Sequence, residues 1–287
     1  MTVRKQFKMC LPCLNEMGDQ AKFRRLAVCA DDFGYSEGAS LSIIALAARQ
    51  AISSTSCLVD GRWFAQYAAE LRSVGTNLAL GLHLNFTSPP APRHSPLAPL
   101  VLKAFTTGVA SRQVLEQEIA RQCDLFEQTM GCPPDFVDGH KHVHQLPTIR
   151  EPLLDELSRR YDMRVVLRST VPRVARGPKA ALIASLGGRR LERLAQQHGF
   201  DFNRDFAGVY DFTRRIPYAE RMRWWLSSIS DRGLIMCHPQ IGESGGEKQL
   251  ALAAEHTFFA SPEWPVLLAE SRTELLPFTP GEFAQQA

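Results

Sequence analysis

The sequence predicts an α/β fold in which parallel strands are joined by crossover helices. Three observations lead to this prediction. Short apolar runs alternate with longer segments of helical periodicity along most of the 287 residues. The composition, 45% hydrophobic and 22% charged, is ordinary for a globular protein, and a chain of this length can bury one large core. Several predicted strands also end in polar side chains, as strands do at the functional edge of a parallel sheet.

The strands are predicted from the short apolar runs. The first run, residues 26–30, is apolar without alternation, as expected of a strand that is buried on both faces. Later strands are predicted at residues 52–59, 78–84, 136–140, 163–167 and 233–237, with a short strand within 200–206.

Helices are predicted between these strands from apolar side chains at helical spacing. Ser36 and Ser111 each stand where an N-cap is expected. Pro152 is tolerated only in the first turn of its helix. The predicted helices cover residues 39–49, 61–73, 111–130, 147–161, 180–197 with an interruption at Gly187-Gly188, 218–229, 248–254 and 262–270.

A proline-rich segment, residues 86–100, follows the third predicted strand. Long loops at strand ends are often functional, so this segment either closes over a ligand or forms a passive surface loop. Trp224 and Trp225 lie in the predicted helix 218–229, where core packing is favoured over stacking on a ligand.

Composition narrows the classes of protein and partner. The net charge is +3 and the basic residues are scattered, which argues against nucleic-acid binding. Seven dispersed cysteines suit a reducing compartment, and no apolar leader or membrane-spanning stretch is apparent, so we expect a cytoplasmic protein. Residues 1–23 match no pattern and are expected to form a flexible extension, followed by a single domain over residues 24–287. The oligomeric state stays open, with a homodimer as one option.

Polar residues at the strand ends are the candidate functional residues. Asp31-Asp32, His83, His140 and His238 end four predicted strands, and Arg168 ends a fifth. The carboxyl ends of parallel strands share one edge, so these side chains are expected to meet. Taken singly, the aspartate pair could cap the next helix, and His83 could be a hydrogen-bonded core histidine.

The segment from Asp138 to His144 is the most distinctive, because it carries three histidines at alternate positions. In an extended backbone alternate side chains share one face, so several imidazoles could converge on one point. One aspartate and two histidines from separate strand ends form a plausible metal triad with open positions for water. Non-haem iron oxygenases use the same ligand set, so the ligands alone do not name the reaction.

Three blocks of this sequence resemble the signature blocks of the YdjC-like carbohydrate deacetylases, a family that includes chitooligosaccharide deacetylases and hopanoid-biosynthesis-associated proteins. In order along the chain, the blocks are Ala30-Asp31-Asp32-Phe33-Gly34, Gly81-Leu82-His83-Leu84 and Val137-Asp138-Gly139-His140-Lys141-His142-Val143-His144. The resemblance implies a distorted (β/α) TIM-like barrel with its active site at the carboxyl ends of the strands. It also implies a divalent metal and hydrolysis of an N-acetyl group on a sugar, in an oligosaccharide or a glycolipid.

The resemblance also assigns roles residue by residue. Asp32, His83 and His140 match the metal ligands, and Asp31 matches the catalytic base. The metal is expected to be Mg²⁺, with Zn²⁺ as the alternative because two imidazoles favour it. Where some members carry a third adjacent histidine, this chain has Lys141.

The remaining roles are assigned as follows. His238 resembles the general acid near the leaving group, with His144 as its substitute. Arg168 is expected either to orient a carboxylate or to contact substrate, and His142 and His144 are expected to contact substrate or to support the residues that do. The alternatives are a hydrolase of another amide or of a phosphoester, and a non-catalytic carbohydrate-binding relative.

Overall fold

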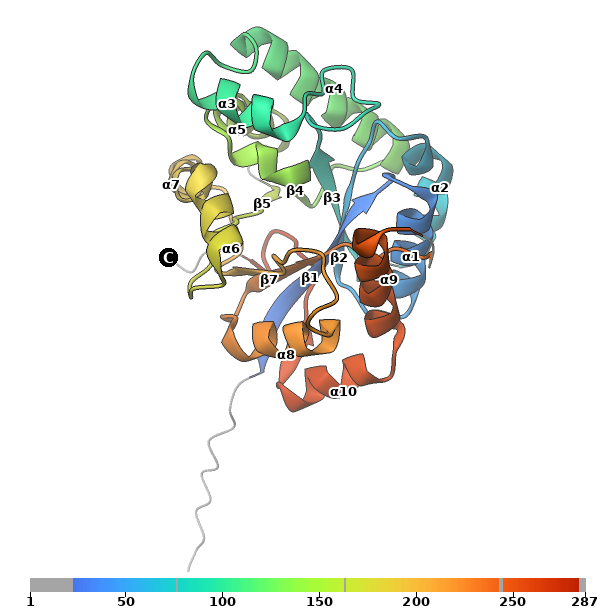
Figure 1. The fold of residues 1–287 in the computed structure, drawn as a ribbon. Helices are drawn as coiled ribbons and strands as arrows, with labels where there is room; N and C mark the ends of the chain where they lie inside the picture. The colour runs from blue at the N-terminus through green and yellow to red at the C-terminus, as the bar shows by residue number, and fades with distance from the viewer. Residues whose placement is uncertain (1–22, 76, 163, 243–244, 284–287) are drawn as a thin grey trace, which may run out of the picture.

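Eight parallel strands form one curled sheet, and helices surround it (Figure 1). The structure, a computed structural model, describes residues 23–75, 77–162, 164–242 and 245–283. The strand order is β5-β4-β3-β2-β1-β7-β6, with β8 paired to β1, and every strand pair is parallel. Beyond β5, Leu167 and Phe202 form an isolated parallel bridge. This curled parallel sheet confirms the α/β class and the barrel-like architecture.

The strands are short, and most coincide with the predicted apolar runs. Their bounds are β1 Arg24–Phe33, β2 Ser54–Cys57, β3 Ala79–Leu84, β4 Phe136–Gly139, β5 Val166–Leu167, β6 Phe206–Ala207, β7 Gly233–Cys237 and β8 Thr273–Leu275. β1 is buried from Leu26 to Asp31, as its unbroken apolar run predicts.

The helices lie between the strands in sequence. Their bounds are α1 Glu37–Ala48, α2 Arg62–Ser73, α3 Leu97–Phe105, α4 Arg112–Met130, α5 Pro147–Tyr161, α6 Pro178–Ile183, α7 Arg189–His198, α8 Tyr218–Ser228, α9 Glu247–Ala260 and α10 Glu263–Glu270. Ser36 and Ser111 cap α1 and α4 through their hydroxyl oxygens, as predicted. Because Ser36 already caps α1, capping does not account for the Asp31-Asp32 pair. None of the helices in the described part of the chain is long and apolar enough to cross a membrane.

Four local predictions were wrong. The proline-rich segment contains a helix, α3, and β8 was not predicted. Pro152 lies beyond the first turn of α5, inside the helix, although its ring removes a backbone donor there. The strand that was predicted through His140 ends at Gly139, and His140–Gln145 form a short 3-10 segment instead.

Two further predictions have a different outcome. The interruption predicted at Gly187-Gly188 is a π-helical turn, Ala184–Gly188, between α6 and α7. The expectation of a flexible extension at residues 1–23 lies almost wholly outside the described residues.

Candidate active site

A carboxylate and two imidazoles meet at the carboxyl edge of the sheet. One ligand atom from each of Asp32, His83 and His140 lies within 4.8 Å of the other two. Asp32 Oδ1 is 2.9 Å from His140 Nδ1 and 3.4 Å from His83 Nε2. This donor set, one oxygen and two imidazole nitrogens, fits a divalent metal ion with room for water or substrate.

A bulge at the end of β1 brings two adjacent aspartates to the same site. In a regular strand Asp31 and Asp32 would point to opposite faces of the sheet. The register of β1 against β2 shifts between Ala30 and Phe33, and Asp32 has a left-handed backbone with φ 73°. The sequence alone gives no sign of this bulge, but the site depends on it.

His83 is held by a second carboxylate, Asp138. The two residues are partners in the β3–β4 register, so their side chains lie side by side. His83 Nδ1 lies 2.6 Å from Asp138 Oδ1 and 2.9 Å from the Ser56 hydroxyl. Burial disfavours the charged imidazole, but Asp138 and Asp32 outweigh burial and raise the pKa of His83 to about 10. With Nδ1 turned to Asp138, Nε2 faces Asp32, the arrangement that orients metal-binding histidines, and a metal ion at Nε2 would replace the proton that the raised pKa holds on the ring.

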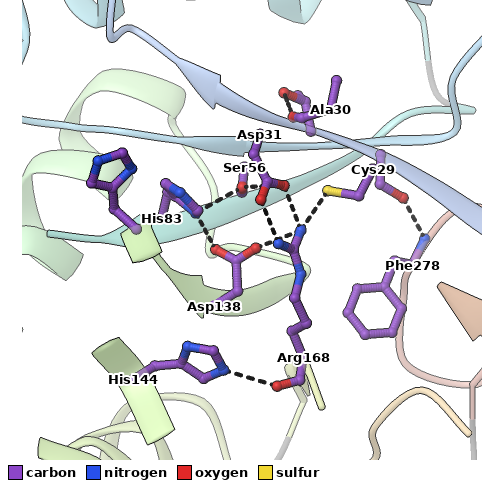
Figure 2. Close-up of polar contacts among 12 residues, drawn as sticks. Cys29, Ala30, Asp31, Ser56, His83, Asp138, His144, Arg168 and Phe278 are labelled. Atoms are coloured by element: carbon purple, nitrogen blue, oxygen red, sulfur yellow. Dashed lines mark hydrogen bonds and ion pairs between the residues drawn. The ribbon is translucent and has the colours of Figure 1, made fainter. Parts of the chain in front are cut away.

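Asp31 forms a buried ion pair with Arg168 (Figure 2). Both guanidinium nitrogens, Nη1 and Nη2, donate to its carboxylate at 2.6 Å, and Nη2 also lies 2.6 Å from Asp138 Oδ2. Burial would raise the pKa of Asp31, but Arg168 outweighs burial and holds that pKa well below its usual range. Asp31 is therefore an ionised carboxylate at neutral pH.

Arg168 also lies within a second group of potential metal ligands. Cys29, Asp31 and Asp138 also place one ligand atom each within 4.8 Å of one another. The Arg168 guanidinium lies among them, and its Nη2 is 3.0 Å from Cys29 Sγ. A cationic side chain thus balances this cluster, which leaves the Asp32 group as the candidate metal centre.

His238 directly follows β7, and its imidazole lies close to the Asp31 carboxylate. Its Nε2 is 3.9 Å from Asp31 Oδ2, and the edge of its ring meets Phe212 at a centroid distance of 5.3 Å. Burial lowers the pKa of His238, although Asp31 and Asp32 act in the opposite direction.

These residues open into a cavity of about 430 Å³. Asp31, Asp32, His83, His140 and His238 are among the polar residues that line it. Much of the remaining lining is apolar, and three lysines also belong to it. The apolar and lysine residues of the lining include Leu97, Leu182, Ile183, Leu186, Val209, Phe212, Met236, Leu252, Lys141, Lys179 and Lys248. Leu97 comes from α3, so the proline-rich segment contributes to the cavity.

The predicted substrate-contact residues divide into two groups. His142 lines the cavity, while His144 and Arg168 are fully buried behind it. His144 Nε2 is 2.9 Å from the Arg168 carbonyl oxygen, and burial lowers its pKa to about 4. Arg168 is paired with the Asp31 carboxylate, which matches one of the two roles expected of it, and neither Arg168 nor His144 is among the residues that line the cavity.

The three histidines do not share one face, because the backbone is not extended after His140. Lys141 and His142 both have left-handed φ values, 54° and 61°, so the chain turns directly after His140. Of the three histidines, only His140 belongs to the Asp32, His83 and His140 ligand set. Asp138, two residues before His140, contacts both His83 and Arg168, and the sequence alone did not indicate a role for it.

The fold and this site are those of an α/β barrel-like protein with a candidate metal centre at the carboxyl ends of its strands. The chain belongs to the YdjC-like family, whose model matches residues 25–270.

The chain is also similar to curated proteins and shares its fold with a solved structure. The chain is 32% identical over 133 residues to a chitooligosaccharide deacetylase of Escherichia fergusonii, and 33% identical over 132 residues to one of Serratia marcescens. These alignments cover 44% and 43% of this chain, and the chain spans about half (52%) of the length of each relative. A crystal structure from Enterococcus faecalis V583, named provisionally as a cellobiose-phosphate cleavage protein, has the same fold. It gives a TM-score of 0.66 at 19% identity, over 90% of this chain and 98% of that one.

Proposed function

We propose that this protein is a metal-dependent hydrolase that removes the acetyl group from an N-acetylated sugar. One observation carries the proposal: an ionised, arginine-bound carboxylate, Asp31, stands directly beside the Asp32, His83 and His140 ligand set at the end of a cavity. A protein that only binds sugar has no need of a base at that position. Family membership and the names of the curated relatives support the same activity.

The bound divalent ion would supply Lewis acidity, polarising the amide carbonyl and lowering the pKa of water. Asp32, His83 and His140 would hold it. Two imidazole nitrogens favour Zn²⁺ by ligand preference, whereas the family resemblance suggests Mg²⁺, and metal analysis of the purified protein decides between them.

Asp31 would act as the general base. It is ionised because Arg168 lowers its pKa, so it can accept a proton from the attacking water. Arg168 and His144 would support it from behind, since neither side chain lines the cavity.

His238 would act as the general acid on the other side of the scissile bond. Its imidazolium would protonate the departing amine, and its lowered pKa makes the charged form the stronger proton donor. His142, which lines the cavity, would contact the sugar.

The cavity lining supports two classes of substrate. Its polar residues suit an N-acetylated sugar, and its apolar residues suit either the carbon face of a second sugar ring or the apolar part of a glycolipid. The buried free thiols at Cys29, Cys57, Cys123 and Cys237 suit a reducing compartment, and we propose a cytoplasmic enzyme.

Acetate release tests the proposed function. The substrates are N-acetylglucosamine oligosaccharides and an N-acetylglucosaminyl lipid, each assayed with and without chelator. We expect release from at least one class, loss of release on chelation, and recovery on adding Mg²⁺ or Zn²⁺. Release that survives complete metal removal would contradict the metal role. Hydrolysis of a phosphoester panel without acetate release would favour the rival hydrolase.

A further inference from the structure

A buried carboxyl group lies directly behind His238. Glu255 of α9 is 0% exposed. Its Oε2 accepts a hydrogen bond of 2.5 Å from the His238 backbone N–H, and its Oε1 accepts one from the Tyr210 hydroxyl. Both donors are neutral groups. A buried carboxyl group that accepts its hydrogen bonds from neutral donors such as these is costly, which points to a role at this place.

The same carboxyl is linked to the wall beside the His238 ring. Tyr210 and Phe212 both line the cavity, and their ring centroids are 4.8 Å apart. Phe212 in turn meets the His238 ring edge to face. Glu255 therefore bonds to the backbone N–H of His238. Through Tyr210 it also bonds to the pair of aromatic side chains, Tyr210 and Phe212, that lies beside the His238 ring.

The chemistry of Glu255 fits an anchor better than a reactant. It does not line the cavity, so it cannot touch substrate. Burial raises its pKa to about 8, which makes it largely the neutral acid at pH 7. In that form Oε2 still accepts from the His238 N–H, while the protonated Oε1 donates to the Tyr210 hydroxyl oxygen, so this second bond runs in the opposite direction to that of the ionised form. Glutamine has the same shape, with a carbonyl for His238 and an amide donor for the Tyr210 oxygen.

We propose that Glu255 is a positioning residue for the general acid, fixing His238 and the Tyr210–Phe212 wall in the geometry that protonates the leaving amine. This inference rests on the proposed function. It predicts that the hydrogen bonds of Glu255 matter for turnover while its charge does not.

The test compares two substitutions at the same position. Glu255→Leu removes both hydrogen bonds at similar volume and should lower kcat roughly 10- to 100-fold, with KM and metal content unchanged, because misplacing a catalytic group costs about that much. Glu255→Gln should stay within about threefold of the wild-type kcat. A wild-type kcat for the leucine variant, or an equal loss in both variants, overturns the proposal.

Two further variants separate positioning from loss of fold. Tyr210→Phe removes one of the two bonds without emptying the core and should lower kcat by several-fold, roughly between the other two variants. Glu156→Leu replaces another buried glutamate, on α5, that contacts Arg159 and Arg160 away from the cavity. It should reduce stability while keeping kcat. If Glu255→Leu does not fold, an unchanged kcat in Tyr210→Phe still overturns the proposal.

A readout that needs no turnover distinguishes this inference from the proposed function. The imidazole resonances of His238 are followed by NMR in ¹⁵N-histidine protein, assigned with His238→Gln. Glu255→Leu should shift and broaden them, while Glu255→Gln and Glu156→Leu should leave them in place. If wild type releases no acetate but these shifts occur, the proposed function fails and the anchoring of His238 stands. If acetate is released and the resonances are unmoved in Glu255→Leu, the anchoring fails.

Discussion

Asp31 and Asp32 are adjacent, but different side chains contact them, and these contacts determine which of the two we propose as the base. Asp31 receives two hydrogen bonds from Arg168, while Asp32 faces two imidazoles. Both carboxylates have a lowered pKa although burial alone would raise it. Their partners differ in kind, because a guanidinium keeps its charge and imidazoles can be neutral metal ligands. This difference is the basis for proposing Asp31 as the base and Asp32 as a metal ligand.

Asp31→Asn should separate these two roles. The amide cannot accept the proton from water, so turnover should fall by on the order of 10²–10⁴-fold, while metal content stays at the wild-type level. Asp32→Asn and His83→Ala should lose the metal as well as turnover. Metal analysis and acetate release on the same preparations check this. Near-normal turnover in Asp31→Asn would show that Asp31 is not the base.

The pH dependence of stability should report the buried Glu255. Its pKa is raised by burial from 4.5 to about 8 in the folded protein, with Tyr210 and the His238 N–H acting against the shift and Asp31 adding to it. Between these two values the unfolded chain has released this proton and the folded chain keeps it. The folded state therefore loses up to about 1.4 kcal/mol of stability per pH unit from this group as pH rises through that window.

The matched variant isolates this contribution. Glu255→Gln cannot titrate, so its stability relative to wild type should rise between pH 5 and about 8 and level off above. Urea unfolding at a series of pH values measures the difference. A difference that is flat across the window would place the folded-state pKa near the unfolded one.

The sequence indicated which residues come together at the cavity, but not how the backbone positions their side chains. Strand-end position alone pointed to Asp31, Asp32, His83, His140 and His238, because parallel strands share an edge. What it missed depends on backbone conformation: the bulge at Asp32 and the left-handed turn after His140. Asp138 was passed over because its partner, His83, lies on another strand, and pairing registers are not visible in one sequence.

At the scale of elements, a side chain of α4 fixes the segment that follows β3. Gln122 is 0% exposed, and its amide exchanges two hydrogen bonds with the backbone of Asn85, at 2.8 and 2.9 Å. The Asn85 side chain in turn bonds to the backbone of Thr87 and Ser88. This connection holds the chain two residues beyond His83.

Gln122→Leu should destabilise the protein by about 2–4 kcal/mol. The substitution leaves the Asn85 N–H and C=O buried without these partners, and each such group costs about 1–3 kcal/mol. Gln128→Leu on the same helix is the control, because Gln128 is exposed and should change stability by less than about 0.5 kcal/mol. Denaturant unfolding compares the two. Equal effects would mean that the Asn85 contacts contribute nothing beyond the cost of a leucine on α4.

The long helices were predicted closely, whereas the proline-containing helix and the two-residue strands were predicted poorly. α4 and α5 match their predicted ranges closely, since long amphipathic segments are distinctive. α3 was missed because prolines mask a helix that begins directly after Pro96 and carries Pro99 in its first turn. β5 and β6, at two residues each, are set by their sheet neighbours rather than by local sequence.

At the scale of the whole molecule, the candidate metal centre joins parts of the chain that are far apart. Its candidate ligands come from β1, from β3 and from the turn after β4, and Asp31, the proposed base, is paired with Arg168, which follows β5. The centre therefore exists only when this part of the sheet has formed. A ligand that binds only the folded state stabilises the whole molecule by mass action.

Metal binding should accordingly raise global stability without being required for folding. The chelated protein should fold, because the ligands already have protein partners: His83 pairs with Asp138, and His140 with Asp32. Metal at 100 times its dissociation constant should add about 2.7 kcal/mol. Asp32→Asn should abolish this increment. Asp162→Asn is the control and should keep it, because Asp162 has the same left-handed backbone but is exposed. Thermal and urea unfolding with chelator, Mg²⁺ or Zn²⁺ measure it, and a chelated wild type that is unfolded would instead identify the metal as a structural requirement.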